Sequence, residues 1–213
     1  RVLFRSLRSL MLQIIFISFL FWGSDFGDVT LAANQVLLQF LSITAHALDG
    51  FAFAAEALVG QAFGACSVVR LRRGALLTSI WGVVVCVALA IAFASFGGVL
   101  IDLMAKAPEV QIEARNYLIY MTLAPILGLA DYMLDGVFIG ATRTRDMRNM
   151  MALSLLVYVV AALLLAPSMG NHGLWLALLI SFVARGVTLG LRYPALERAA
   201  TNLTDLTKSP SIL

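Results

Sequence analysis

Charged side chains are scarce in this sequence. Lys, Arg, Asp and Glu together make up 13% of the 213 residues, whereas hydrophobic residues make up 61%. Soluble domains contain about 25% charged residues and about half apolar ones, so this composition excludes an ordinary soluble globular domain. The net charge is only +3, and we expect no nucleic-acid partner.

Cysteine is equally rare. Cys66 and Cys86 lie 20 residues apart, which fits neither a metal-binding spacing nor a disulfide framework, so both are interpreted as small hydrophobic residues. The sequence also lacks a His-Glu cluster, a GxSxG motif and a Cys-His pair, the usual signs of an intramembrane hydrolase. We therefore predict no metal site, no cofactor and no enzymatic activity.

The start of the chain lacks two further features. It begins at Arg1 instead of Met and passes directly into a long apolar block. A cleavable signal peptide would have a shorter apolar core followed by a small-residue cleavage site. We interpret the chain as a fragment of a larger protein.

What the sequence has in place of charge is long apolar runs. About 20 apolar residues in a helix cross the hydrocarbon core of a bilayer, and six such segments predict an all-α, multi-pass membrane protein over residues 1–200. The second and fourth segments exceed 30 residues, so they must tilt, kink or project from the membrane. Pro125 offers a kink in the fourth. The six segments are Leu7–Gly23, Val29–Gly64, Gly74–Phe96, Val110–Ala141, Met147–Pro167 and Gly173–Tyr193.

Basic residues predict how the segments are oriented. If the segments alternate in direction, twelve basic residues fall on one side of the membrane, and the positive-inside rule makes that side cytoplasmic. Both ends of the chain are then cytoplasmic, with residues 201–213 predicted as a polar, disordered tail. Trp22 and Trp175 are expected at the outer interface. The twelve are Arg1, Arg5, Arg8, Arg70, Arg72, Arg73, Arg143, Arg145, Arg148, Arg192, Arg198 and Lys208.

The second segment carries a polar stripe. At 100° per residue its polar side chains fall within an arc of about 100°. An Asp at the centre of a membrane costs about 2.5–3.5 kcal/mol even on lenient insertion scales, so this face must point into the protein or into a water-filled cavity. The stripe consists of Gln35, Gln39, Ser42, His46, Asp49 and Glu56.

The fourth segment carries a second acidic face, because Asp131 and Asp135 lie four residues apart on one side of a helix. Asp49 and Asp131 are therefore predicted to face one interior space. A structural alternative stays open, in which Glu56 and Asp135 pair with basic loop residues such as Arg143 and Arg145 and latch the cytoplasmic ends together.

Two pairs of glycines with small-xxx-small spacing accompany these acids. Gly60 and Gly64 lie on the second segment, and Gly136 and Gly140 lie on the fourth. Such pairs allow helix backbones to approach closely inside a membrane. They predict helix contacts at these positions without any role in binding.

Two long motifs suggest a family. The order "GDVTLAANQVLLQFLSITAHALDGFAFAAEALVGQAFGA" followed by "DYMLDGVFIGATRTRDMRN" resembles the multidrug and toxic compound extrusion (MATE) family, in its DinF-like branch. The resemblance implies helices seven to twelve of a twelve-helix, two-lobe transporter in the inner membrane, with the N-terminal lobe as partner. It also implies an antiporter that exports cationic or amphipathic toxic compounds in exchange for H⁺ or Na⁺.

The coupling acids of the family can be matched to residues of this sequence only in part. The main coupling acid of the DinF-like branch lies on the first helix of the missing lobe, so no residue is carried over for it. Other branches use acids on helices seven and ten, but the first segment here has no internal acid, which disfavours a shared sodium site. The cavity hypothesis then rests on Asp49, Asp131, His46, Gln39 and Gln35.

Three other functions remain open. A lipid-linked oligosaccharide flippase of a related superfold would need a basic cavity for pyrophosphate, and Arg185 is the only cation within the apolar spans that suits it. A membrane-embedded enzyme would need a catalytic set that is not visible. A passive assembly subunit explains the packing glycines but leaves the polar stripe unexplained.

Overall fold

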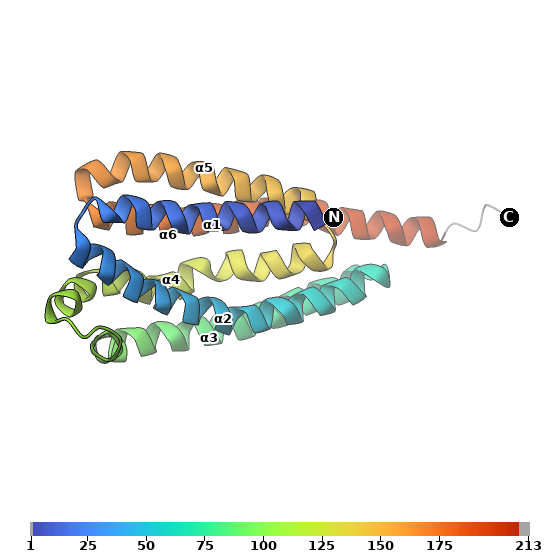
Figure 1. The fold of residues 1–213 in the computed structure, drawn as a ribbon. Coiled ribbons are helices and arrows are strands. Elements are labelled where there is room, and N and C mark those ends of the chain that lie inside the picture. The colour runs from blue at the N-terminus through green and yellow to red at the C-terminus, as the bar shows by residue number, and fades with distance from the viewer. Residues whose placement is uncertain (1, 209–213) are drawn as a thin grey trace.

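The protein forms a bundle of six long helices (Figure 1). The computed structural model describes residues 2–208, with side chains described at residue 7 and at 9–201. Only short turns separate the helices. The helices are α1 (Val2–Ser24), α2 (Asp28–Gly64), α3 (Val68–Met104), α4 (Pro108–Gly140), α5 (Thr144–Met169) and α6 (Asn171–Lys208).

Successive helices run in opposite directions, so the first and last helices bring both chain ends to the same end of the bundle (Figure 1). The α2–α3 and α4–α5 turns lie at that end as well. Helices α2, α3 and α4 pack together, α5 packs against α6 and α1, and α4 contacts α6 to join the two groups. The sequence had predicted this alternation, and with it the gathering of the basic loops at one end.

All six predicted helices are present. Five of them are long and apolar enough to cross a membrane, and α1 contributes a shorter apolar stretch, Ser9–Ser24. The all-α membrane fold is therefore confirmed. Pro125 lies inside α4, in the segment where it was expected.

The main difference concerns helix length. Helix α3 begins six residues before and ends eight residues after the predicted segment, and α6 continues to Lys208 instead of ending at Tyr193. The prediction of a disordered tail is thus wrong for residues 201–208, while 209–213 lie outside the described residues. Contacts at the end of the bundle hold this extension of α6. Arg72 Nε and Nη2 donate to Glu197 at 2.7 and 2.8 Å, and Arg143 donates to the Ala195 carbonyl at 3.0 Å.

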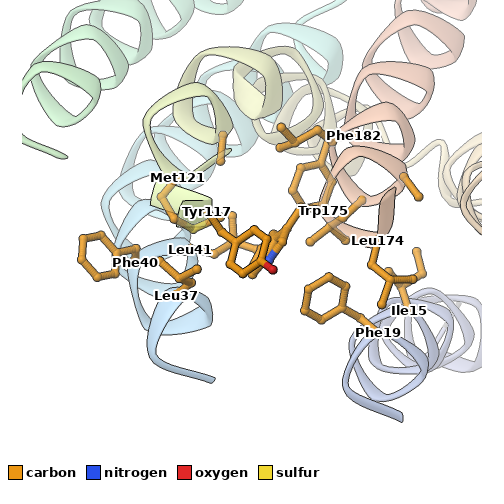
Figure 2. Close-up of a cluster of buried hydrophobic side chains, with 14 of the residues drawn as sticks. Ile15, Phe19, Leu37, Phe40, Leu41, Tyr117, Met121, Leu174, Trp175 and Phe182 are labelled. Atoms are coloured by element: carbon orange, nitrogen blue, oxygen red, sulfur yellow. The ribbon is translucent and has the colours of Figure 1, made fainter. Parts of the chain in front are cut away.

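A large apolar core joins all six helices, and Figure 2 shows side chains that α1, α2, α4 and α6 contribute to it. Trp175 is fully buried there and meets Phe19 edge to face, with ring centroids 4.5 Å apart. The prediction that Trp175 lies at the lipid interface is therefore wrong, because its indole nitrogen finds a partner inside, the Asn34 Oδ1 at 2.9 Å. Trp22 is half-buried and stacks on Tyr158.

Helices α2 and α4 touch through their backbones. A Cβ on Gly136 would lie 2.3 Å from the Ala52 carbonyl oxygen, and one on Gly140 would lie 2.5 Å from the Glu56 carbonyl oxygen. Gly60 faces Gly140 across the same contact, whereas a Cβ on Gly64 would meet nothing within 4 Å. The predicted small-residue packing is therefore correct for three of the four glycines. It places the polar stripe of α2 beside the acids of α4.

Candidate functional site

A cavity of about 510 Å³ lies between α1, α2, α4 and α6. Apolar side chains form most of its wall, with Phe16, Phe53 and Phe182 among them. Polar groups interrupt that wall on all four helices. The polar lining residues are Gln13, Ser42, His46, Asp49, Glu56, Asp131, Tyr132, Asp135 and Arg185.

The helical period explains why the α2 residues meet here. Ser42, His46, Asp49 and Glu56 are spaced by three, four or seven residues, so they lie along one side of the helix. The close α2–α4 contact then brings that side next to Asp131 and Asp135. Asp49 and Asp131 line one space, as the sequence indicated. What they bind there stays a prediction.

Gln35 and Gln39 lie elsewhere. Both are exposed and line a separate hollow of about 390 Å³, together with Lys106 at the α3–α4 turn. The stripe is thus divided between two sites, because α2 is longer than the cavity and its first turns extend past it. The grouping of these two glutamines with Asp49 is therefore wrong.

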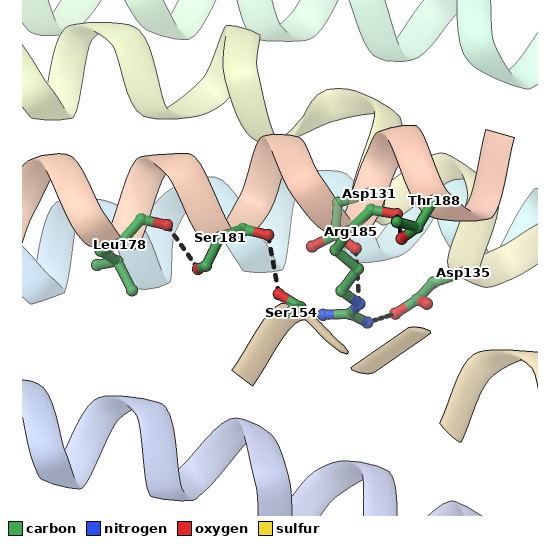
Figure 3. A network of polar contacts seen from close by, with 7 residues as sticks. All are labelled: Asp131, Asp135, Ser154, Leu178, Ser181, Arg185 and Thr188. Atoms are coloured by element: carbon green, nitrogen blue, oxygen red, sulfur yellow. Dashed lines mark hydrogen bonds and ion pairs between the residues drawn. The ribbon is translucent and has the colours of Figure 1, made fainter. Parts of the chain in front are cut away.

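The most buried polar group of the cavity is an ion-pair cluster of Asp131, Asp135 and Arg185 (Figure 3). Arg185 Nε lies 2.8 Å from Asp131 Oδ1, and Arg185 Nη2 donates to Asp135 Oδ2. The Asp131 and Arg185 side chains are only 5% and 7% exposed, and that of Asp135 is 15% exposed. One guanidinium from α6 therefore serves two carboxylates from α4, which leaves the cluster with one net negative charge when all three are ionised.

This cluster involves one residue of the predicted cytoplasmic latch. Asp135 pairs with Arg185 on α6. Arg143 instead faces Asp146 at 3.7 Å, and Arg145 is exposed. Asp135 thus has a buried partner on α6, and the role of Glu56 and Asp135 as a latch stays a prediction. Glu56 lies on the cavity wall.

Asp49 differs from the other acids of the cavity. It is half-buried, and among the described residues no hydrogen bond or ion pair reaches its carboxylate. His46, one turn away, bonds through Nδ1 to the Ser42 carbonyl at 2.6 Å. Since a carbonyl only accepts, Nδ1 must be the donor, and in a neutral ring Nε2 is left as an acceptor.

The position of Arg185 inside an apolar span could have predicted that it forms an ion pair within the bundle. Charged residues inside membrane spans nearly always face the interior and pair with one another, and Arg185 stands in an apolar span with Asp131 and Asp135 in another. From the sequence, Arg185 relates only to the flippase alternative. No sequence signal distinguished Gln13 or Phe16 on α1, which reach the cavity because α1 contacts α2 and α6.

Comparison with known proteins identifies the family. The MatE family model matches residues 6–164. This chain belongs to the MatE family. It is also 39% identical over 189 residues to the DNA damage-inducible protein F of Escherichia coli (strain K12), an alignment that covers 86% of this chain and 40% of that protein. The resemblance read from the two motifs is thereby confirmed.

Solved MATE structures share the fold. The chain superposes on the Vibrio cholerae MATE transporter VcmN in its bent form with a TM-score of 0.83 and 18% identity, over 92% of this chain and 45% of that one. It superposes on an outward-facing multidrug resistance MATE transporter with a TM-score of 0.80 and 17% identity, over 96% and 46%. The chain therefore spans less than half the length of the relatives that it matches.

These matches establish the architecture and the class. The six helices are one six-helix lobe of a MATE protein, a multi-pass membrane protein of a transporter family and not an enzyme. A lobe of this kind has a second lobe as its partner. The cavity between α1, α2, α4 and α6 lies within the single lobe described here.

Proposed function

We propose that this lobe is half of a secondary antiporter that exports cationic or amphipathic compounds in exchange for H⁺ or Na⁺ across the inner membrane, with both chain ends in the cytoplasm. The observation that carries the proposal is Asp49, a carboxylate without a hydrogen-bond or ion-pair partner among the described residues, on the wall of a 510 Å³ cavity. Cavities of about 300–1,000 Å³ suit drug-sized ligands.

The charge of the cavity favours cations. The described residues that line it include four carboxylates and one guanidinium, an excess of three negative charges if all are ionised. A charge in a medium of low dielectric constant requires a counter-charge, and a cationic substrate supplies one to Asp49. Phe16, Phe53 and Phe182 supply apolar surface and aromatic faces for the rest of an amphipathic compound.

Antiport of substrate against the coupling ion follows if the two compete for the same carboxylate. The coupling ion is either a proton or a metal cation. A proton on Asp49 removes the charge that attracts the substrate, and the ion gradient then drives export when the two ligands favour different conformers. Alternating access between two lobes is the usual scheme for transporters built from two halves. The missing lobe supplies the opposite wall and, by family resemblance, the main coupling acid.

The flippase alternative is weaker on the same observations. Among the described residues that line the cavity, Arg185 is the one cation, and two carboxylates already engage it. A pyrophosphate group would meet a net negative wall and would be repelled. A MOP superfamily transporter of Pyrococcus furiosus, similar in fold at a TM-score of 0.78 and 16% identity over 88% of this chain and 42% of that one, is described as having a binding pocket of reversed polarity and a different function.

The test compares two Asp→Asn variants of the full-length protein in everted vesicles. Asp49→Asn keeps size but loses charge, and we expect the transport of a cationic dye such as ethidium to fall by roughly tenfold or more, the value of one charge-assisted contact. Asp25→Asn, an exposed acid in the α1–α2 turn, is the control and should transport normally. Full transport by Asp49→Asn, with unchanged dependence on the ion gradient, would overturn the proposal.

A further inference from the structure

The side of α2 that borders the cavity presents three different chemical groups in succession. His46, Asp49 and Phe53 are spaced by three and four residues, so they follow one another along one side of the helix. All three line the cavity. Neighbours at this spacing have Cβ atoms about 5–6 Å apart, so one drug-sized ligand can contact an imidazole, a carboxylate and an aromatic ring together.

His46 has a defined hydrogen-bonding role in this set. Its Nδ1 donates to the Ser42 carbonyl at 2.6 Å, so in the neutral ring the other nitrogen, Nε2, carries no hydrogen and can only accept. Among the described residues, no hydrogen bond reaches Nε2. The bond to the backbone holds the ring, and Nε2 is left as an acceptor for a group that enters the cavity.

Asp49 and His46 respond to different properties of a cation. A carboxylate attracts any cation through its charge, whereas Nε2 forms a hydrogen bond only with a cation that carries an N–H. A quaternary ammonium ion has the charge but no such donor. It would displace water from Nε2 without replacing the hydrogen bond, and a polar group left unpaired in this way discriminates against the ligand.

Phe53 contributes the apolar part of the set. The residue is 65% exposed in this lobe and lies one helical turn from Asp49. An aromatic ring at that distance from the carboxylate suits the ring of an aryl-alkyl ammonium ion, because aromatic pairs stabilise each other beyond the area that they bury.

We propose that His46 is a specificity-determining residue of the cavity, and that the cavity prefers amphipathic ammonium ions with at least one N–H over quaternary ammonium ions. This substrate class rests on the proposed function, because it requires that a cation binds at Asp49. The ammonium nitrogen lies between the two side chains and donates to the carboxylate and to Nε2 of His46. The apolar part of the ligand packs against Phe53.

The experiment measures equilibrium binding to the purified full-length protein for two cations that differ only at nitrogen. Naphthylmethylammonium carries N–H groups and its N,N,N-trimethyl derivative carries none, while both have the same charge and the same aromatic ring. The readout is the ratio of their dissociation constants, quaternary over ammonium, at about pH 8, where an ordinary imidazole is neutral. For His46→Leu we expect this ratio to fall by about tenfold or more relative to the unsubstituted protein, the value of one charge-assisted hydrogen bond.

Two further variants accompany this measurement. Gln39→Leu is the matched control, since Gln39 lies on α2 but lines the separate hollow, and its ratio should equal that of the unsubstituted protein. His46→Phe keeps an aromatic ring without either nitrogen and should lower the ratio as His46→Leu does, so the test does not depend on the folding of one variant. Binding of the quaternary ion should persist in both His46 variants, which verifies an intact cavity.

The possible failures separate the two proposals. The role of His46 is overturned if the ratio is unchanged in a His46 variant that still binds the quaternary ion. It is also overturned if neither His46 variant binds either ion, because His46 would then maintain the cavity instead of selecting its ligands. If the unsubstituted protein binds neither cation, or if Asp49→Asn binds both as tightly as it does, the proposed function fails as well. An unchanged ratio together with weaker binding of both cations by Asp49→Asn would remove the role of His46 and leave the proposed function standing.

Discussion

Asn34 is the centre of a buried polar junction between α2 and α6. Its Nδ2 donates to Asn171 Oδ1 at 2.8 Å, and its Oδ1 accepts from Asn171 Nδ2 and from Trp175 Nε1, both at 2.9 Å. The three side chains are almost completely buried. Every donor that reaches this junction is satisfied, and in a low-dielectric interior such a network specifies how two helices pack.

Replacing Asn34 by Leu should therefore destabilise the protein. The Asn171 amide and the Trp175 indole would lose their partners while still buried, which costs about 1–3 kcal/mol for each group left unsatisfied. Thermal unfolding of the full-length protein measures the effect. The control is Gln35→Leu, at the adjacent exposed position; equal midpoints for the two variants would contradict the assignment.

At the residue scale, the sequence predicted which residues share a face of one helix. It did not predict which residues of two different helices contact each other. The period of α2 placed His46, Asp49 and Glu56 on one face, because that spacing is a property of a single helix. The pairing of Asp131 and Asp135 with Arg185 depends on α4 lying against α6, which no spacing within either helix records. The prediction that Trp175 lies at the outer interface is wrong for the same reason, since its hydrogen-bond partner Asn34 belongs to another helix.

At the element scale, the contact between α2 and α4 depends on the absence of side chains. A Cβ on Gly136 would lie 2.3 Å from the Ala52 carbonyl oxygen, which belongs to backbone and cannot rotate away. Gly136→Ala should therefore push the helices apart and lower the free energy of unfolding by about 1–3 kcal/mol. Gly50→Ala on α2 is the matched control, because its Cβ would meet nothing within 4 Å; its stability should be unchanged or higher, since Ala favours helix. Equal losses for both variants would be inconsistent with backbone contact.

The face that α2 turns toward the cavity can be tested by chemical labelling. In a variant of the full-length protein with Cys66 and Cys86 replaced, a cysteine at position 49 should react with a hydrophilic maleimide, because Asp49 lines the cavity. A cysteine at the adjacent position 48 should not, because Leu48 is fully buried. Reaction of position 49 with membrane-soluble reagents alone would show that water does not reach the cavity.

Helix ends were the least predictable part of the fold. Apolar runs identified all six helices, because hydrophobic length is what a bilayer selects. Arg70, Arg72 and Arg73 lie in the added first turns of α3, and polar residues continue α6, where hydropathy carries no signal. At its other end, α3 continues through Gly97 and Gly98, which interrupt the apolar run without ending the helix. The pair of Arg72 with Glu197, 125 positions apart, holds the extension of α6 and lies beyond the reach of a local pattern.

At the scale of the whole molecule, the proposed function needs more than this lobe. The acids, Arg185 and the aromatic side chains of the cavity all lie among four helices of a single lobe, and the chain covers less than half of the MATE proteins that it matches. Alternating access requires a second body that moves against the first. Under the proposed function, the activity of this lobe therefore depends on a partner lobe.

Residues 1–213 reconstituted alone into liposomes should accordingly fail to export a cationic dye when a proton or sodium gradient is imposed. The helices should still form, because each apolar span satisfies its own backbone hydrogen bonds in lipid, and circular dichroism together with selective labelling at position 49 over position 48 would verify folding in the same sample. Adding the N-terminal lobe as a separate polypeptide should restore transport, and Asp49→Asn in this lobe should reduce the restored activity while Asp25→Asn should not. Gradient-driven efflux by residues 1–213 alone would show that one lobe suffices and would refute the two-lobe mechanism.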